Sequence, residues 1–259
     1  MPPSAPTSTF DLLVLGAGPA WSSLPDAAGA SYLIRTPATA ILLDLGQGSF
    51  PRLASAIEPS RLDAVVISHL HPDHFIDLVP LRHYLTYELR PPRRMRVIAP
   101  DGLAGRLDAL HAEPGFTAVA LDLEPHPVTP VAIGDLRLEA RRVAHTDNSH
   151  AVRLSPPDGP GIVYSGDCGR AGDLAPLIRP GDTLLVEASF GVGPVPNGAM
   201  HLDAPAIAGL VASTAPGRVL LTHIQDGADP DGAVDIVRRA TSGRVRAVRP
   251  GDRIDLLPG

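Results

Sequence analysis

The most restrictive feature of the sequence is the apolar run LDAVVI (62–67), which is followed directly by SHLHPDHF (68–75). Six consecutive positions in the second segment hold three histidines and one aspartate: His69, His71, Asp73 and His74. A short apolar run of this kind predicts a buried strand. Imidazole nitrogens together with a carboxylate oxygen suit a borderline divalent ion such as zinc. The sequence therefore predicts a buried strand whose end presents metal ligands.

The alternative interpretation is a polar loop with incidental histidines. The spacing argues against it, because imidazolium charges so close together would repel one another. One turn cannot easily enclose an ion, so further ligands are expected from other strand ends. Three candidates each end an apolar run: His145 after LRLEARRVA, Asp167 after GIVYSG and His223 after RVLLT. Because a sheet presents its strand ends along a common rim, we expect these side chains to lie near residues 69–74.

Strand-like runs alternate with Gly/Pro turns along most of the chain. Strands are expected at 12–18, 31–35, 40–46, 62–69, 95–100, 117–123, 136–145, 151–156, 161–167, 182–189 and 218–224, with a closing strand pair in 245–259. Helices are expected at 73–85 (interrupted by Pro80), 101–113 (with Asp101 as N-cap), 203–215 and 230–240. This order predicts an α/β protein in which two sheets pack together with helices outside. A single domain is expected over residues 1–259, with 1–9 as an extended or disordered segment.

Composition narrows the class of protein. Of the 259 residues, 44% are hydrophobic, which is enough for a folded core. The formal net charge of −6, with no basic block, argues against a general nucleic-acid surface. No apolar run is long enough for a membrane span or a secretory signal, so a cytoplasmic protein without a membrane partner is expected. The single cysteine, Cys168, excludes an intrachain disulfide and is expected to be a small residue in a tight loop.

Four motifs carry a resemblance to a known family. SHLHPDHF matches the H-x-H-x-D-H signature of the metallo-β-lactamase superfamily, and VAH (143–145), SGD (165–167) and LTH (221–223) resemble its later metal motifs, in order. The resemblance spans roughly residues 10–257. It implies the metallo-β-lactamase fold, an αβ/βα sandwich of two mixed β-sheets flanked by helices. It also implies a dinuclear metal site in a cleft at one edge of the two sheets.

The same resemblance implies a role for each ligand. His69, His71 and His145 would bind one ion, Asp73, His74 and His223 would bind the other, and Asp167 would bridge the two. Two Zn²⁺ ions per chain are expected, with Mn²⁺ or Fe as alternatives. A bridging carboxylate suits two dications about 3.5–4 Å apart, and such a pair lowers the pKa of a shared water to near neutrality. The resemblance thus implies a metal-dependent hydrolase, in which Asp73 also has a catalytic role by orienting the bridging hydroxide.

The C-terminal third of the sequence indicates a branch of this family. VEASFG (186–191), MHLDAPAIAGLVA (200–212) and RVLLTHI (218–224) resemble the end of ribonuclease Z and its phosphodiesterase relatives. In those relatives the histidine matching His201 faces the scissile phosphate, which implies a catalytic role in stabilising charge or protonating the leaving group. The alternative is that His201 only caps the start of a helix.

One departure from ribonuclease Z bears on the substrate. The basic arm of that enzyme would lie between His145 and Asp167, where this chain has only the turn PPDGPG (156–161). Structured transfer RNA is therefore not expected as a partner. A small-molecule phosphodiester of the cyclic-nucleotide or cyclic-phosphate type is expected instead. The alternatives are hydrolysis of a lactone, thioester or β-lactam, and a non-catalytic metal-binding carrier protein.

Several further residues carry weaker expectations. Trp21, in GAGPAW (16–21), could line the substrate entrance or pack on the surface, and that motif is not a dinucleotide fingerprint. Glu187 is expected either to support a ligand histidine or to be a buried acceptor. His150 and Ser165 adjoin the metal motifs and are candidates for contact with substrate or ligands. Solvated surface positions are expected for His83, His111 and His126, and the apolar residues of 75–89 are sufficient for a homodimer interface.

Overall fold

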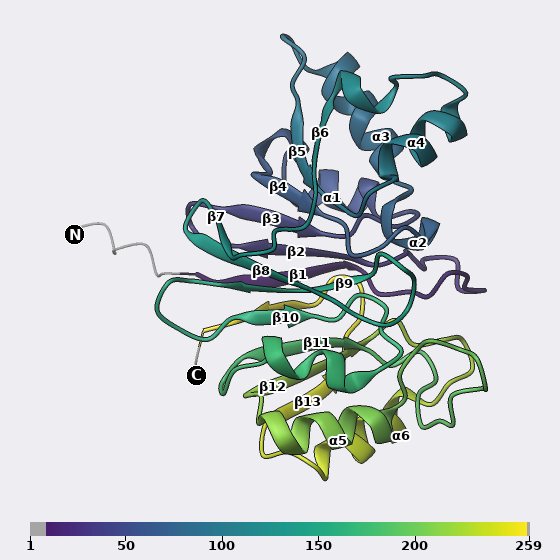
Figure 1. Ribbon diagram of the computed structural model, residues 1–259, viewed down its shortest axis with the longest axis vertical. Helices are drawn as coiled ribbons and strands as arrows, with labels where there is room; N and C mark the ends of the chain where they lie inside the picture. Colours follow the sequence, from purple (N-terminus) through teal and green to yellow (C-terminus); the bar gives the residue numbers. More distant parts are fainter. Residues whose placement is uncertain (1–8, 258–259) are drawn as a thin grey trace.

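The structure is a computed structural model that describes residues 9–257. Within these residues, two mixed seven-stranded sheets pack face to face, and helices cover both outer faces (Figure 1). The expected αβ/βα sandwich is thus confirmed. The expectation for the N-terminal segment 1–9 lies, apart from Thr9, outside the described residues.

The first sheet has the strand order β14-β1-β2-β3-β4-β5-β6. Its strands are β1 (Asp11–Gly16), β2 (Ser31–Arg35), β3 (Ala40–Leu43), β4 (Ala64–Val66), β5 (Met95–Ile98), β6 (Leu121–Glu124) and β14 (Arg253–Asp255). β14, β1, β2 and β3 pair antiparallel, whereas β3 to β6 pair parallel. The parallel part brings the carboxyl end of β4, where the histidine cluster begins, to the same edge as the end of β3.

The second sheet has the strand order β13-β12-β11-β10-β9-β8-β7. Its strands are β7 (Val131–Ile133), β8 (Leu136–Arg142), β9 (His150–Ser155), β10 (Ile162–Tyr164), β11 (Thr183–Glu187), β12 (Arg218–Thr222) and β13 (Arg244–Ala247). β10 to β13 pair parallel, and β7 to β10 pair antiparallel. The carboxyl ends of β10, β11 and β12 therefore share one edge.

Helices divide between the two outer faces. The first sheet carries α1 (Phe50–Ala56), α2 (Pro72–Phe75), α3 (Leu78–His83), which continues as a π-helical turn (Tyr84–Glu88), and α4 (Leu103–His111). The second sheet carries α5 (Ala204–Thr214) and α6 (Pro230–Arg238). Each of these last two helices begins with an aspartate N-cap whose side chain accepts a backbone N–H, Asp203 from Ala206 and Asp229 from Gly232.

Alternating side-chain directions along the strands explain the four layers of the fold, which are two sheets and the helices on each outer face. On β3, Ile41 and Leu43 pack between the sheets, whereas Leu42 packs under the helices of the first sheet. On β12, Leu220 faces inward, and Val219 and Leu221 face α5 and α6. Because successive side chains of a strand point to opposite faces, an uninterrupted apolar run buries both faces of a sheet.

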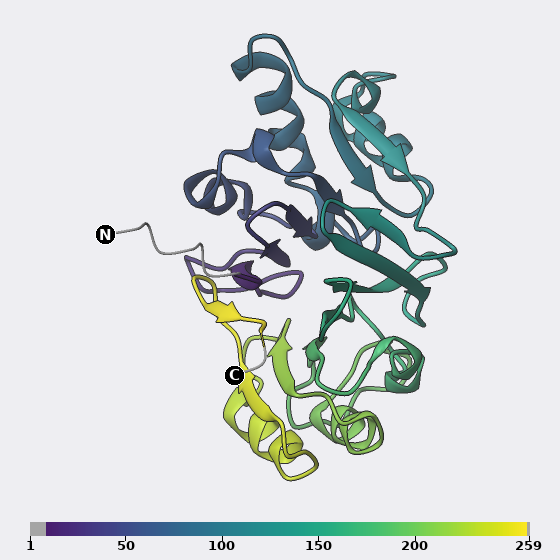
Figure 2. The same ribbon diagram turned by 90° about the vertical axis from the view of Figure 1, so that its left-hand side faces the viewer.

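The predicted closing strand pair is wrong. β13 joins the second sheet beside β12, and β14 joins the first sheet beside β1. Figure 2 shows the yellow C-terminal strand next to the purple N-terminal one. The turn between β13 and β14 is hydrogen-bonded to both sheets. The Val248 N–H donates to the Leu221 carbonyl, and the Gly251 N–H donates to the Val14 carbonyl. The chain therefore crosses from one sheet to the other where a hairpin was expected.

Three other expectations differ in detail. The 117–123 strand is shorter, because Asp108 accepts the backbone N–H and hydroxyl of Thr117 and bends residues 117–119 into a 3-10 turn. Asp101 is not an N-cap, since Gly102, with φ of 94°, takes that position before α4. The helical segment 73–85 breaks before Pro80, which sits in the first turn of α3, where a missing N–H costs little.

Within residues 9–257, no helix combines the length and the apolar character that a membrane crossing requires.

Candidate metal centre

The histidine cluster lies on a loop that the preceding strand positions at the sheet edge. β4 ends at Val66, and the chain then bends at Leu70 and His71; His71, whose own backbone is extended, is the N-cap of α2. Pro72 occupies the first helical position, where its fixed φ favours a helix and its missing N–H has no cost. The abrupt change from extended chain to helix turns Asp73 and His74 toward the same space as His69.

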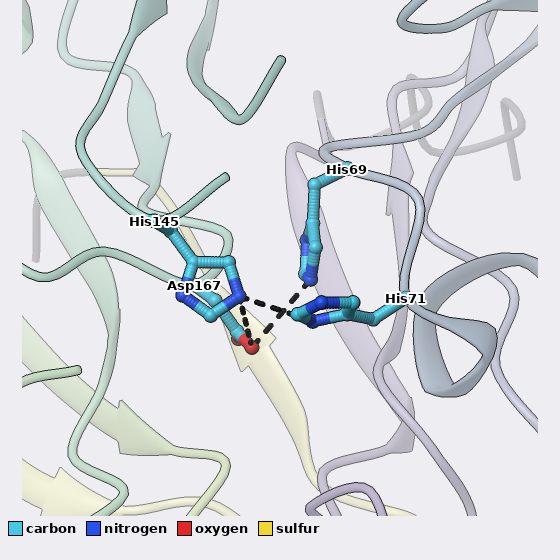
Figure 3. Close-up of side chains that lie close together, drawn as sticks. All are labelled: His69, His71, His145 and Asp167. Atoms are coloured by element: carbon cyan, nitrogen blue, oxygen red, sulfur yellow. Dashed lines mark hydrogen bonds and ion pairs between the residues drawn. The ribbon is translucent and has the colours of Figure 1, made fainter. Parts of the chain in front are cut away.

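The first group of candidate ligands contains His69, His71, His145 and Asp167, whose ligand atoms lie within 4.8 Å of one another. Figure 3 shows the three imidazole rings converging on the carboxylate of Asp167. Asp167 Oδ2 lies 3.6 Å from His69 Nε2 and 3.5 Å from His145 Nε2. His145 Nε2 also lies 3.1 Å from His71 Nδ1.

The second group contains Asp73, His74 and His223. Asp73 Oδ2 lies 3.1 Å from His223 Nε2 and 3.4 Å from His74 Nε2. The two imidazole Nε2 atoms are 3.4 Å apart. All three side chains are buried, and together they form a compact set of nitrogen and oxygen donors.

Asp167 lies between the two groups. Its Oδ2 faces His69 and His145, and its Oδ1 lies 3.3 Å from His74 Nε2 and 3.6 Å from His223 Nε2. Each carboxylate oxygen therefore belongs to a different group, as a bridging ligand requires. The structure thus brings together all seven predicted ligands, from the ends of β4, β8, β10 and β12.

The donor set fits divalent ions. His69 Nε2 and Asp167 Oδ1 are buried yet lack a hydrogen-bond partner among the described residues. Such orphaned polar atoms are rare in folded proteins and are explained where an ion occupies the space between them. In addition, two pairs of imidazole nitrogens approach within 3.4 Å, His71 with His145 and His74 with His223. A cation shared between such nitrogens removes the repulsion of their lone pairs.

Electrostatics favours neutral imidazoles in the first group, whereas the charge of Asp167 outweighs burial and raises the pKa of His74 and His223 in the second group. Burial lowers the pKa of His69 well below its usual value, and also lowers the pKa of His71 and His145. Although burial opposes it, hydrogen bonds from His223 and His74 lower the pKa of Asp73 below its ordinary value. Neutral imidazoles and ionised carboxylates are the forms that bind metal.

Asp44, which was not predicted from the sequence, contacts the second group of candidate ligands through His74. It follows β3, is fully buried and has a φ of 56°, a conformation that aspartate tolerates better than most residues. Its carboxylate accepts hydrogen bonds from the Ser68 N–H (2.6 Å), His74 Nδ1 (2.7 Å) and the Tyr164 hydroxyl (2.6 Å). Its position after the apolar run AILL is the same signal that identified His145, Asp167 and His223.

Glu187, at the end of β11, is linked by hydrogen bonds to two histidines of the site, His201 and His223. Its Oε2 accepts the hydroxyl of Ser189 at 2.6 Å, and that hydroxyl lies 3.0 Å from His223 Nδ1. Its Oε1 lies 2.9 Å from His201 Nδ1 and also accepts the Cys168 N–H. Glu187 therefore contacts His201 directly and His223 through Ser189.

His201 lies beside the seven candidate ligands. Its Nδ1 is held by Glu187, and its Nε2 makes no hydrogen bond to the described residues, while 21% of the side chain is exposed. Burial acts to lower the pKa of His201, but the hydrogen bond and charge of Glu187 outweigh burial and raise the pKa. The arrangement leaves a polarised N–H available to a molecule bound in front of the site.

Close backbone contacts fix the loop that carries Asp73. The Ala30 N–H donates to the Asp73 carbonyl, and the Leu45 N–H donates to the His74 carbonyl. A Cβ added at Gly46 would lie 1.9 Å from the Asp73 carbonyl oxygen. Glycine at position 46 therefore allows the segment after β3 to approach the 68–74 loop. Backbone contacts with this segment fix the position of the loop.

The weaker candidates have different surroundings. The Ser165 hydroxyl donates to the Gly166 carbonyl and accepts the Glu187 N–H, so it supports Glu187 and not the ligands directly. Trp21 is 70% exposed on the loop between β1 and β2. The backbone of that loop does reach the site, since the Ala17 carbonyl accepts the His223 N–H. Cys168 points away from the ligands, with its Sγ 3.2 Å from the Arg170 carbonyl.

His150 and His126 form a stacked pair, with ring centroids 4.1 Å apart. The His150 N–H donates to the Ser68 carbonyl, so its backbone supports the metal loop, while its ring lies against His126. The expectation of a solvated surface position for His126 is wrong. Its ring is partly buried, and its Nε2–H donates to the Ile67 carbonyl at 2.9 Å. The burial is produced by packing against a distant segment, which the local sequence does not reveal.

Comparisons with known proteins extend these observations. A family model described as a β-lactamase superfamily domain matches residues 39–224. An uncharacterized Mycobacterium leprae protein, ML1173, is 31% identical over 240 residues, which cover 90% of this chain and 84% of that protein. A ribonuclease Z of Mycobacterium marinum is 29% identical over 200 residues, which cover 69% of this chain and 67% of the enzyme.

Solved structures share the fold. The metallo-β-lactamase fold protein YhfI from Bacillus subtilis has a TM-score of 0.84 and 20% identity, covering 96% of this chain and 100% of YhfI. A diphosphatase from the PhnP family has a TM-score of 0.74 and 16% identity, covering 95% and 97% of the two chains. Zn²⁺-bound PqqB from Methylobacterium extorquens has a TM-score of 0.71 and 15% identity, covering 95% and 100%.

Proposed function

The chain belongs to the metallo-β-lactamase superfamily of metal-dependent hydrolases, and we propose that it hydrolyses a small phosphodiester at a dinuclear metal site. The observation that carries this proposal is the position of Asp167, whose two oxygens face two separate groups of candidate ligands. Two divalent ions held by these groups, most simply Zn²⁺, would lower the pKa of a shared water molecule and so supply the attacking hydroxide.

The residues around Asp167 have distinct roles in this proposal. His69, His71 and His145 would hold one ion, and His74, His223 and Asp73 would hold the other. Asp73, with one oxygen 3.1 Å from His223, would also orient the attacking water or hydroxide. Asp44 and Glu187 fix the orientation of the second group from opposite sides.

His201 is proposed to act on the leaving group. Its Nδ1 hydrogen bond to Glu187 fixes the ring and leaves Nε2 free to donate to a phosphate oxygen or to the departing alkoxide. The alternative role in capping the helix is filled by another residue, since the Asp203 side chain caps the start of α5. This supports a chemical role for His201.

The space beside the site supports a small substrate. A cavity of about 920 Å³ is lined by the 17–28 loop, the 222–228 loop and the 247–250 turn, and His223 is the one candidate ligand that lines it. β9 and β10 are joined by a turn of a few residues, where an RNA-binding arm would have to be inserted. The likeness to a ribonuclease Z and to a diphosphatase supports chemistry at phosphorus. We propose a small molecule, of the cyclic-nucleotide or cyclic-phosphate type, as the substrate.

The alternative activities are distinguishable by experiment. A lactone, thioester or β-lactam hydrolase would need the same ions but no proton donor placed for an alkoxide leaving from phosphorus. A carrier protein is the other alternative, and zinc-bound PqqB is a protein of similar fold. The complete ligand set and the Glu187–His201 pair favour hydrolysis over transport.

The test is a substrate panel combined with metal analysis. Zinc-loaded protein should contain two ions per chain and cleave bis-p-nitrophenyl phosphate faster than nitrocefin or any lactone. Asp73→Ala and His71→Ala should each lose bound metal and most activity, whereas His111→Ala, a matched change on α4, should lose neither. Equal turnover by Asp73→Ala and the parent protein would refute the proposal.

We further propose that residues 9–257 act as one domain. The central apolar cluster contains side chains of both sheets, such as Ile41 of β3 and Leu220 of β12. Neither sheet can cover its inner face without the other, so the two sheets are expected to unfold together.

A further inference from the structure

Four arginines gather at the edge of the sandwich opposite the metal centre. Arg218 begins β12, whose other end leads to His223, so this edge is about 17 Å from the metal rim at roughly 3.3 Å per residue. Arg218, Arg244, Arg246 and Arg253 line one cavity of about 390 Å³. The cavity lies between β13 and β14, the edge strands of the two sheets.

The strand register explains why these side chains share one space. Arg218 pairs with Arg244, and Leu220 pairs with Arg246, across the parallel strands β12 and β13. Val219 and Val245 point to the helices of the second sheet, so the alternating arginines point to the other face, toward β14. Arg218, Arg244 and Arg246 thus form a row on the face of the second sheet that borders the cavity, and Arg253 lines the cavity from β14.

The positive charge of this row is incompletely balanced. Among residues 9–257, Arg244 has no carboxylate partner, and Arg246 has only a distant one, with 3.6 Å between it and Asp252. Arg253 lies 3.6 Å from Asp11, but Asp11 already accepts two hydrogen bonds from Arg35. Burial is the main cause of the lowered pKa of Arg218; the charge of Arg244 adds to this effect, and Asp255, which also lines the cavity, opposes it.

We infer that this cavity, defined by Arg218, Arg244, Arg246 and Arg253, binds a small metabolite that carries two phosphoryl groups. Guanidinium groups bind phosphate through paired N–H donors, and four of them around one cavity suit two phosphates. The chain has a net charge of −6, so a local excess of arginine is not a general property of its surface. The cavity is separate from the proposed catalytic site.

A simpler role for the arginines is protection of the two edge strands against pairing with other chains. Charged side chains on edge strands serve this purpose in many proteins. Protecting the edge strands requires only that the arginine side chains be charged and exposed to solvent. A binding site requires in addition that a doubly phosphorylated ligand saturate it, with loss of binding when particular arginines are replaced.

The test is calorimetric titration of the zinc-loaded protein with fructose 1,6-bisphosphate at low salt. One site per chain is expected, with weaker binding as sodium chloride is raised and with much weaker binding of fructose 6-phosphate. The double variant Arg244→Gln/Arg246→Gln should bind at least tenfold more weakly and keep full activity on bis-p-nitrophenyl phosphate. The matched control Arg238→Gln/Arg239→Gln, on α6, should bind like the parent protein.

Three results would overturn the inference. They are no saturable binding to the parent protein, equal affinity in Arg244→Gln/Arg246→Gln, or an equal loss in the α6 control. Equal affinity in the double variant would mean that the ligand binds elsewhere on the protein. If thermal unfolding shows that the double variant is not folded, Arg244→Gln and Arg246→Gln are each titrated alone, and each must weaken binding.

Discussion

Asp44 Oδ2 lies 2.7 Å from His74 Nδ1, and both side chains are fully buried. The same carboxylate accepts hydrogen bonds from Ser68 and Tyr164, so its position is fixed from three directions. Because Nδ1 of His74 is held in this way, Nε2 of the ring is directed at Asp73 and Asp167. Asp44 thus sets which nitrogen of His74 faces the other candidate ligands.

Asp44→Asn is expected to lower zinc affinity by about 10–100-fold, because the amide cannot accept all of these hydrogen bonds. Asparagine tolerates the positive φ of this position, so the backbone should be preserved. The measurement is competitive zinc titration with a chromophoric chelator. Asp63→Asn, which removes a charge from the exposed start of β4, is the control and should bind zinc normally. Unchanged affinity in Asp44→Asn would mean that the hydrogen bond to His74 is dispensable.

Gly46→Ala is expected to destabilise the protein by about 1–3 kcal/mol or more and to weaken metal binding. The added Cβ would meet the Asp73 carbonyl oxygen, and backbone atoms on both sides cannot move aside cheaply. Urea unfolding of the two proteins gives the free-energy difference. Gly105→Ala is the matched control. It lies in α4 with open space around it, and should instead stabilise by about 0.5–1 kcal/mol. Similar effects from both substitutions would contradict the close approach at Gly46.

Glu187→Gln is expected to move the alkaline limb of the kcat profile to lower pH. The hydrogen bond and charge of Glu187 raise the pKa of His201 against the effect of burial, so removing that charge lowers it. A proton donor is active below its pKa and inactive above it, which fixes the direction of the shift. Activity on bis-p-nitrophenyl phosphate is measured from pH 5 to 10. Glu124→Gln, on the exposed end of β6, should leave the limb in place, and an unmoved limb in Glu187→Gln would exclude His201 as the donor.

His126 is expected to make stability depend on pH. Burial, followed by the charge of His150, lowers the pKa of His126 from 6.5 to about 3. The unfolded state therefore binds a proton at a higher pH than the folded state. Stability from this group is complete above pH 6.5 and falls by up to about 1.4 kcal/mol for each pH unit as the pH drops toward 3. Urea unfolding of His126→Gln should show a smaller loss between pH 7 and 5 than the parent protein, whereas His111→Gln should match the parent.

The sequence predicted the fold class because the relevant signals are local. Uninterrupted apolar runs such as AILL and RVLLT identify strands that are buried on both faces, and the structure has β3 and β12 there. Local signals also pointed to candidate ligands, since His145, Asp167 and His223 each lie within three residues of the end of a strand. His69, His145 and Asp167 lie in one group, as expected of side chains that follow strands ending at the same edge of the sheets.

The errors arose where distant segments decide local structure. β14 was expected beside β13, but the free edge of β1 provides a partner that lies more than 230 positions earlier in the chain. His126 was expected in solvent because the ring of His150 and the Ile67 carbonyl, which enclose it, lie far away in sequence. Asp44 was not predicted, although it follows an apolar run as other candidates do, because its hydrogen-bond partners Ser68, His74 and Tyr164 lie 24 to 120 positions away in the sequence.

The pairing of β14 with β1 has a consequence for synthesis of the protein. The first sheet contains the loop with four candidate ligands, yet its outermost strand is made last. During translation β1 emerges early and keeps an open edge until residues 253–255 have left the ribosome. Maturation of the N-terminal half thus waits for the C-terminal strand, and a nascent chain halted before residue 253 would expose a template for unwanted β-pairing.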